Sequence, residues 1–149
     1  MSYETEEPKV EIMQEVAIAV ENKNMKQAVA LYEDLFGFKF NLEWTLPNEN
    51  IHVKAAKLGR TQLQIIESTS PEGVVAKFIQ SRGEGLNHIA FKVANLQQMV
   101  AKLKKKGVKL IPEEPVAILP GTPISRGSYI FIHPKSAHGV LIELIESES

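Results

Sequence analysis

The chain contains two copies of one pattern of residues. The first copy begins at Glu15 and reads EVAIAVEN, and the second begins at His88, 73 residues later, and reads HIAFKVAN. Each copy alternates as a β-strand does. Each is followed by apolar residues three and four apart and then by Gly37 or Gly107, which is typical of a helix that ends at a glycine. A repeat of this length predicts two similar modules, so the chain is restricted to folds that use one unit twice.

The two modules also end alike. The stretch LQIIE begins at residue 63, and IELIE begins at residue 142. Before these last strands, apolar runs predict further strands near 38–45 and 51–57 in the first half and near 109–111 and 128–133 in the second. A helix from about 70 to 83, begun by Ser-Pro-Glu, joins the halves. Each half is therefore predicted to be βαβββ, with module one at about 12–67 and module two at about 85–147, in a single domain of residues 1–149.

Strand alternation predicts which side chains point away from the helix of each module. Neighbouring side chains in a strand point to opposite faces. If the apolar residues beside Glu15 and His88 pack on the helices, these two side chains point to the other face, as do Gln64 and Glu143 on the last strands. We therefore expect an α+β fold in which two repeated βαβββ modules form a cupped, mostly antiparallel eight-stranded sheet around a metal site.

Four chelating side chains occupy equivalent positions in the two modules, Glu15 with His88 and Gln64 with Glu143. Any one of them alone is explained as a solvated strand residue, but their joint placement favours a common site. An imidazole, two carboxylates and an amide oxygen suit one divalent ion such as Zn²⁺, Co²⁺, Ni²⁺, Mn²⁺ or Fe²⁺. Four ligands with open positions are what a Lewis-acid catalyst needs.

The composition excludes several other classes of function. In 149 residues, 17 Lys and Arg balance 18 Asp and Glu, which leaves no broad basic surface for nucleic acid. With 0 cysteines, neither a disulfide framework nor a thiolate metal site can form. Residues 1–8 lack the apolar run of a signal peptide, and no stretch approaches the roughly 18 apolar residues of a membrane span. We expect a cytoplasmic protein.

Several segments resemble the vicinal oxygen chelate superfamily (glyoxalase, bleomycin resistance protein and dioxygenase) and, within it, the methylmalonyl-CoA epimerase family. The stretch GLNHIAFKV begins at residue 85, and HPKSAHGVLIEL begins at residue 133. KGVKLI from residue 106 and LYEDLFG from residue 31 are similar to the same family. The resemblance covers about residues 12–147, and the segment that begins at residue 133 is fairly specific to the epimerase branch.

The resemblance implies that the family's metal ligands fall at Glu15, Gln64, His88 and Glu143. Epimerases usually have a histidine where this chain has Glu15, whereas the other three positions match in kind. Carboxylate or amide ligands occur at the first position elsewhere in the superfamily, so metal binding is still expected. Two carboxylates should favour a harder ion and make it a weaker electrophile.

The epimerase resemblance also implies a reaction that moves a proton on and off the carbon next to a thioester, through an enolate whose oxygen the metal holds. Two acid/base groups must then flank that carbon, and Glu143 matches one of them. The family's second group, a glutamate, aligns near His52, which can transfer protons because the ordinary pKa of histidine is about 6.5. An ordinary exposed strand residue is an equally good interpretation of His52, and Glu49 is a nearby substitute.

Substrate contacts are expected from Trp44, from Lys135, which can meet a CoA phosphate, and from His138. The function implied by the resemblance is epimerisation of a short 2-substituted acyl-CoA, such as methylmalonyl-CoA, by a homodimer. The departures at Glu15 and His52 support an alternative, which is a glyoxalase-type isomerase or lyase or another biosynthetic enzyme of the superfamily. A third possibility is a non-catalytic module that sequesters a ligand without metal, which the four chelating residues disfavour.

Overall fold

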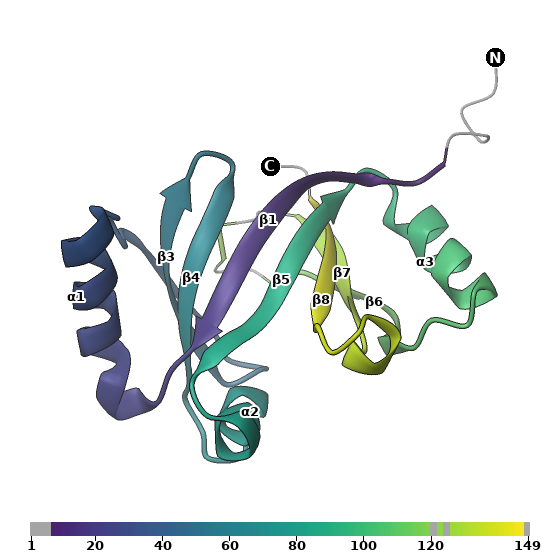
Figure 1. The fold of residues 1–149 in the computed structure, drawn as a ribbon. Helices are drawn as coiled ribbons and strands as arrows, with labels where there is room; N and C mark the ends of the chain where they lie inside the picture. The colour runs from purple at the N-terminus through teal and green to yellow at the C-terminus, as the bar shows by residue number, and fades with distance from the viewer. Residues whose placement is uncertain (1–6, 120–121, 124–125, 148–149) are drawn as a thin grey trace. The chain divides into compact units, whose positions relative to one another are not determined.

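The computed structural model of the protein describes residues 7–119, 122–123 and 126–147. Eight strands form one mixed sheet in the order β2-β3-β4-β1-β5-β8-β7-β6 (Figure 1). In chain order the elements are β1 (Val10–Ala19), η2 (Asn22–Asn24), α1 (Met25–Phe36), β2 (Leu42–Leu46), β3 (Ile51–Leu58), β4 (Thr61–Ser68), α2 (Val74–Arg82), β5 (Gly85–Val93), α3 (Leu96–Lys105), β6 (Leu110–Ala117), β7 (Gly127–Ile132), η3 (Pro134–Ser136) and β8 (Ile142–Ser147). The predicted α+β fold with two βαβββ repeats is confirmed.

The chain divides into two compact units, each of which we describe by itself. The N-terminal unit contains residues 14–88 and 122–123, and the C-terminal unit contains the described residues among 1–13, 89–120 and 124–149. Strands β1 and β5 contribute residues to both units. The division therefore falls within these two strands and not at the predicted linker near residues 70–83, which belongs to the N-terminal unit.

In the N-terminal unit, β3 pairs antiparallel with β2 and β4, and β4 pairs parallel with β1. Helix α1 lies beside β3 and β4 (Figure 1), and it covers one face of these strands through Met25 and Val29, which pack against Ile65. We call this the α1 face. Helix α2 packs on the opposite face through a second cluster: Ala17, Ala19, Ile51, Val53, Ala55, Ile66 and Val75.

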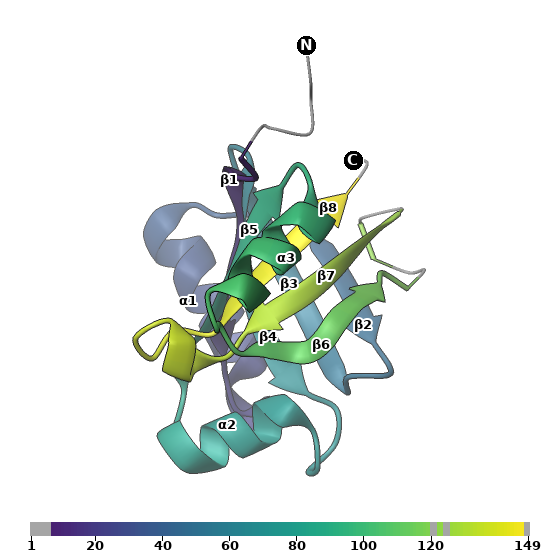
Figure 2. The ribbon, with the colours of Figure 1, turned by 90° about the vertical axis from the view of Figure 1, so that its right-hand side faces the viewer.

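In the C-terminal unit, β8 pairs parallel with β5 and antiparallel with β7, and β7 pairs antiparallel with β6. Helix α3 crosses these strands (Figure 2), and it packs on what we call the α3 face through Leu96 and Val100. The side chain of Asn95 accepts a hydrogen bond from the backbone N–H of Gln98 at 3.1 Å, so it caps the helix as the sequence pattern indicates. Three lysines in the last turn oppose the helix dipole.

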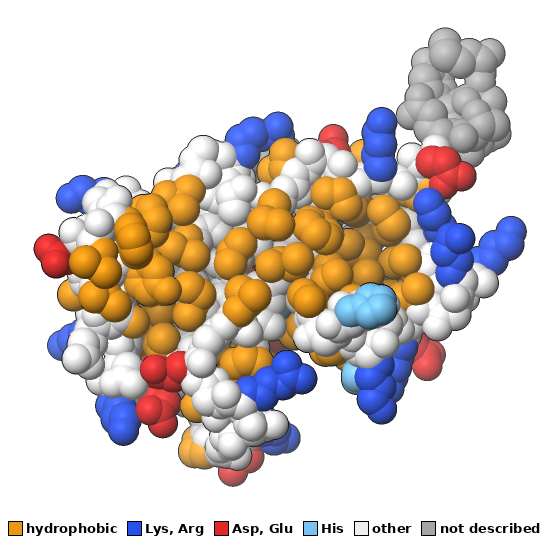
Figure 3. Space-filling model, viewed as in Figure 1, with side chains coloured by type: hydrophobic (Ala, Val, Ile, Leu, Met, Phe, Trp, Pro, Cys, Tyr) orange, Lys and Arg blue, Asp and Glu red, His pale blue; other side chains and the backbone are white. Residues whose placement is uncertain are grey.

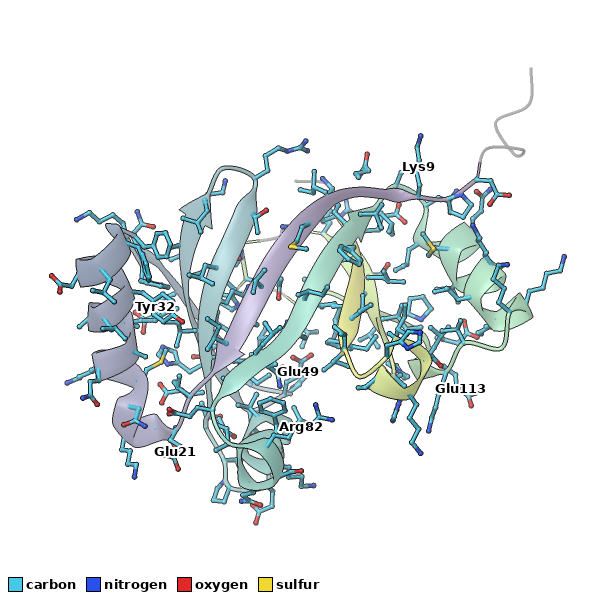
Figure 4. The ribbon with its side chains drawn as sticks, viewed as in Figure 1. Lys9, Glu21, Tyr32, Glu49, Arg82 and Glu113 are labelled. Atoms are coloured by element: carbon cyan, nitrogen blue, oxygen red, sulfur yellow. The ribbon has the colours of Figure 1, made fainter. Side chains whose placement is uncertain are left out.

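The second strand begins later than predicted. We expected a strand near 38–45, but β2 begins at Leu42. Phe38 and Phe40 instead pack in the cluster under α1, where the ring centroid of Phe38 lies 6.4 Å from that of Tyr32. Figure 4 shows Tyr32 on α1 at this position. Burial of the two aromatic rings against α1 therefore replaces strand pairing at the start of this segment.

Two other boundaries also differ. Helix α2 begins at Val74, with Gly73 as its cap, and not at the serine and proline near residue 70. The Ser68 hydroxyl donates to the backbone oxygen of Ser70 at 2.6 Å, which holds this segment in a turn. A Cβ at Gly73 would crowd the Ser68 hydroxyl, so a larger residue there would force this hydroxyl to shift. Strand β6 runs to Ala117, well past the predicted 109–111, because it resumes pairing with β7 after a register shift.

The described part of the chain has no helix whose length and apolar character would suffice to cross a lipid bilayer. The cytoplasmic location stays a prediction from sequence.

Six polar or charged residues of the described chain are buried: Glu15, Gln62, Gln64, Ser68, His88 and Glu143.

Candidate metal centre

Glu15 on β1 and His88 on β5 form a buried polar pair within the N-terminal unit. Their exposed fractions are 8% and 9%, and His88 Nε2 lies 2.9 Å from Glu15 Oε2. On the other side of the ring, His88 Nδ1 lies 2.8 Å from Asn87 Oδ1. When Nδ1–H donates to this amide oxygen, Nε2 is left as the ring nitrogen that can bind a metal on the Glu15 side.

The register of the parallel strands β1 and β4 places Gln64 on the same face as Glu15. Glu15 is the register partner of Gln62, and Ala17 is the partner of Gln64. Register partners share a face, so both glutamines lie on the same face as Glu15, away from α1. Both are buried, and Gln64 Nε2 donates to Gln62 Oε1 at 3.1 Å. This bond orients the amide so that Gln64 Oε1 is the atom left to bind a cation.

Gln62 was not among the residues chosen from the sequence. Strand alternation could have identified Gln62, because this residue lies two positions before Gln64 on the same strand and therefore shares the face of Gln64. A buried glutamine is unusual unless its amide is hydrogen-bonded, and the partner here is a candidate ligand. Gln62 therefore acts as a positioning residue for Gln64.

Glu143 lies on β8 in the C-terminal unit and is also buried. Its register partner is Ala90 on β5. Register partners share a face, so Glu143 lies on the same face of the C-terminal unit as Ala90. This face of the C-terminal unit is the one opposite α3. We call the faces opposite α1 and α3 the site face of each unit.

The donor chemistry of these residues fits a divalent metal ion. Glu15, His88 and Glu143 are each buried and each offers an atom that can ligate a metal. Buried carboxylates are costly unless they are paired or bind a cation. Carboxylate, imidazole and amide oxygen donors are common for first-row divalent ions. The residue types therefore agree with the ligand set that the repeat predicts.

The prediction that His52 lies on the same face as the candidate ligands is wrong. In the β3–β4 pair, Ala55 is the register partner of Gln64, and Val53 is the partner of Ile66. His52 pairs with Glu67 and therefore lies on the α1 face, opposite to Gln64. It cannot serve as the second acid/base group of a site that contains Gln64. The face of His52 could have been predicted from the sequence, because a two-residue turn at Gly59 and Arg60 determines every residue pair of the β3–β4 hairpin.

On the α1 face, His52 links two strands through carboxylates. His52 Nδ1 lies 2.7 Å from Glu67 Oε2, and His52 Nε2 lies 2.6 Å from Glu43 Oε2. Glu67 Oε1 also accepts from Asn22 Nδ2 at 2.9 Å. Burial by itself would lower the pKa of His52, but the hydrogen bonds and charges of Glu67 and Glu43 outweigh burial and raise that pKa above its usual value. The hydrogen bond from His52 lowers the pKa of Glu43.

Of the residues expected to contact substrate, Trp44 lies on the site face of the N-terminal unit. It is the register partner of Val53 and packs against the cluster under α2. Lys135 and His138 are exposed residues of the loop before β8. Ala137 of the same loop packs against the cluster on the α3 face. Contacts of these three side chains with a substrate stay a prediction.

Comparisons with known proteins show which proteins share this sequence pattern and this fold. A model of the family described as the glyoxalase/bleomycin resistance protein/dioxygenase superfamily matches residues 14–125. The mitochondrial methylmalonyl-CoA epimerase of Homo sapiens is 32% identical over 130 residues, which are 87% of this chain and 70% of that protein.

Solved structures of similar proteins share the fold over nearly the full chain. The methylmalonyl-CoA epimerase from Mycobacterium tuberculosis has a TM-score of 0.81 and 30% identity, covering 94% of this chain and 90% of that one. A variant of the Streptomyces coelicolor methylmalonyl-CoA epimerase in complex with 2-nitronate-propionyl-CoA has a TM-score of 0.82 and 27% identity, covering 95% of this chain and 97% of that one. Both similarities include the strands that position the candidate ligands.

The role of His52 can be tested by His52→Ala. Because the pKa of His52 is raised in the folded state, its stabilising effect is fully present below the ordinary pKa of histidine and is lost as the pH rises through the raised pKa. We expect the substitution to cost about 1 kcal/mol at about pH 5.5 and less at about pH 9. Urea denaturation at the two pH values measures this difference.

The matched control is Lys54→Ala, because Lys54 is a half-buried residue of the same face and strand. It should not show the same dependence on pH. Metal content and activity should be unchanged in His52→Ala. Loss of metal in this variant would contradict its assignment to the α1 face.

Proposed function

Because this chain belongs to the glyoxalase/bleomycin resistance protein/dioxygenase superfamily, we propose that it epimerises a short 2-substituted acyl-CoA such as methylmalonyl-CoA. The observation that carries this proposal is the buried Glu15–His88 pair, which shares the site face with Gln64. Proteins named methylmalonyl-CoA epimerase are similar to the chain in sequence and in structure. The chain is an isomerase of the epimerase type, and the identity of the acyl group is the proposed part.

The proposed ligands of one divalent ion are Glu15, Gln64, His88 and Glu143. Asn87 and Gln62 support this set, because their amides orient the imidazole of His88 and the amide of Gln64. Such an ion, when bound, supplies a Lewis acid for the carbonyl oxygen of the thioester. Zn²⁺, Co²⁺, Ni²⁺, Mn²⁺ and Fe²⁺ all suit these donors.

We infer that Glu143 exchanges the proton on the carbon next to the thioester. Its register neighbours on the two adjacent strands are Ala90 and Phe131, which are apolar. A carboxylate in such a setting is little hydrated and therefore exchanges a proton with a bound substrate more readily than with bulk water. In the N-terminal unit, the register partners of Gln64 are Ala17 and Ala55, small apolar side chains suited to contact an acyl group.

A glyoxalase-type isomerase is the second candidate function, and Glu15 is the observation that favours it. A second carboxylate lowers the electrophilic strength of a bound ion, which disfavours a reaction that depends on a strongly polarised thioester. Glyoxalase-type enzymes act on adducts of a thiol with an aldehyde, so a panel of CoA esters and thiol adducts separates the two. A ligand-sequestering module would turn over neither.

The metal site can be tested by elemental analysis. The purified protein should contain about one divalent ion per chain. His88→Ala should remove most of it while the fold stays intact, because the substitution deletes a ligand without touching the helix-packed clusters. His138→Ala is the matched control, since His138 is exposed in a loop, and it should keep its metal. Full occupancy in His88→Ala would show that the ligand set is wrong.

The reaction can be tested by proton–deuterium exchange into methylmalonyl-CoA in D₂O. The metal-loaded protein should introduce deuterium next to the thioester, and Glu143→Gln should reduce this rate by about 10²–10⁴-fold, the usual effect of one placed acid/base group. Metal content measured on the same sample separates loss of the proton acceptor from loss of a ligand. Turnover of a thiol adduct without exchange into any CoA ester would favour the glyoxalase-type candidate.

We propose that the protein is a homodimer. Helix α1 exposes three large apolar side chains, Leu31, Leu35 and Phe36, with exposed fractions of 53%, 60% and 60%. Hydrophobic side chains also gather over α1 and over the strands β1 and β5 in the space-filling view (Figure 3). Exposed apolar surface such as that on α1 is typical of protein interfaces, and strands at the edges of a sheet are usually covered.

Sedimentation at micromolar concentration should therefore give the mass of two chains. Leu35→Lys should shift the protein toward monomer, because it places a charge within the apolar surface. Leu58→Lys changes another exposed leucine, beside the β3–β4 turn, and should leave the dimer intact. A monomer of the unchanged protein at this concentration would contradict the proposal.

A further inference from the structure

Lys109 and His133 form a cross-strand pair at one end of the sheet in the C-terminal unit. Lys109 immediately precedes β6, and His133 immediately follows β7. The backbone N–H of His133 donates to the backbone oxygen of Lys109 at 2.9 Å, which extends the pairing of Leu110 with Ile132 by one residue. The side chains of Lys109 and His133 are therefore neighbours on one face.

This face is the site face of the C-terminal unit. Val108, Leu110 and Ile132 pack in the apolar cluster under α3. The side chains that alternate with them, those of Lys109 and His133, point away from α3. His133 has an extended backbone, with φ −61° and ψ 139°, so the alternation of β7 continues through it. The pair thus lies at the end of the site face.

The turn that follows β7 brings two more polar residues to this pair. The backbone N–H of Lys135 donates to His133 Nδ1 at 3.0 Å. The backbone N–H of Lys109 donates to Ser136 Oγ at 2.9 Å. Ala137 packs against the cluster under α3 and so anchors the end of the turn. Backbone hydrogen bonds therefore hold together four residues that we call the basic cluster: Lys109, His133, Lys135 and Ser136.

The hydrogen bonds of the turn determine which donors the basic cluster can offer to a ligand. A ring nitrogen that accepts a hydrogen bond carries no proton, so the proton of the neutral imidazole of His133 is on Nε2. Ser136 Oγ accepts one bond, and its hydroxyl hydrogen can donate. The ammonium groups of Lys109 and Lys135 are charged donors. Each residue of the basic cluster thus has a donor to offer.

The positive charges of the basic cluster are not neutralised within the described part of the chain. Neither Lys109 nor Lys135 has an ion-pair partner among the described residues. Burial and the charges of these two lysines lower the pKa of His133, and no carboxylate opposes them. Residues 96–112 and 127–142, which contain the basic cluster, include no Asp or Glu. Like charges held close together repel each other, and a bound anion would offset this repulsion.

A phosphate monoester matches the basic cluster in charge and in hydrogen-bonding groups. Such a group carries about −1.5 to −2 charges near neutral pH and has three strong acceptor oxygens. A carboxylate carries a single charge, so it would leave one of the two ammonium groups without a counter-charge. The net charge of −1 for the whole chain disfavours a nucleic acid, which needs a broad basic surface.

We propose that the basic cluster is a binding site for a phosphate monoester group, held by Lys109, His133 and Lys135. Because the basic cluster lies at the end of the site face, the phosphate can belong to a ligand bound over this face or to a separate small molecule. The proposal does not depend on the epimerase reaction, since inorganic phosphate alone can test it.

The test follows the imidazole signals of His133 by NMR in the full-length protein, with inorganic phosphate as the probe and chloride at equal ionic strength as the reference. Phosphate should shift these signals saturably and raise the pKa of His133, because it offsets the charges of the two lysines. Lys109→Met should weaken phosphate binding by about 10- to 100-fold, the usual effect of one hydrogen bond between charged groups. Lys109→Arg should keep most of the binding, since it keeps the charge.

Lys105→Met is the matched control, because Lys105 is another exposed lysine of the C-terminal unit, at the end of α3. It should bind phosphate as the unchanged protein does. Equal weakening in Lys105→Met and Lys109→Met would overturn the proposal in favour of diffuse attraction by surface charge. Equal shifts of the His133 signals in chloride and in phosphate would also overturn it.

CoA and dephospho-CoA identify the source of the phosphate, because they differ only by the 3′-phosphate, which is a monoester. If the basic cluster binds this group, CoA should bind about tenfold or more tightly than dephospho-CoA, and Lys109→Met should remove the difference. If the two bind equally while inorganic phosphate still shifts the His133 signals, the site takes the phosphate of a separate molecule. A protein that responds to none of the three has no phosphate site here.

Discussion

The buried contact between Glu15 and His88 is the interaction on which the site depends. A carboxylate and an imidazole that leave water lose hydration, and each offsets this loss for the other. The two residues lie on the first strands of the two modules, so one contact joins the two copies of the repeat. In the N-terminal unit, the pairing of β1 with β4 places Gln64 on the same face as Glu15.

The two faces of each unit differ in the side chains that they bury. Large apolar clusters lie under α1 and under α3, and the N-terminal unit has a further apolar cluster under α2, on its site face. The network of His52, Glu43 and Glu67 lies on the α1 face and joins three adjacent strands. The buried polar side chains are gathered on the opposite faces. The site face of the N-terminal unit thus carries both buried polar side chains and an apolar cluster that stabilises it.

A carboxylate at position 15 changes the electrostatics of the site and not only its list of ligands. With two carboxylate ligands, the site attracts an anionic substrate less strongly than a site with one would. Recognition of an anionic substrate would then have to come from residues other than the ligands.

The sequence by itself determined the repeat and the fold class, and it singled out four positions with chelating side chains, because alternation within one strand and similarity between two segments are local properties of the chain. Gln62 and His52 show where this reasoning failed. Alternation tells which residues of a strand share a face, but the pairing with the neighbouring strand decides which face that is. The register of β3 against β4 put Val53 and Ala55, and not His52, beside Ile66 and Gln64. Only the tertiary structure decided this, because one residue of register moves every side chain of a strand to the opposite face.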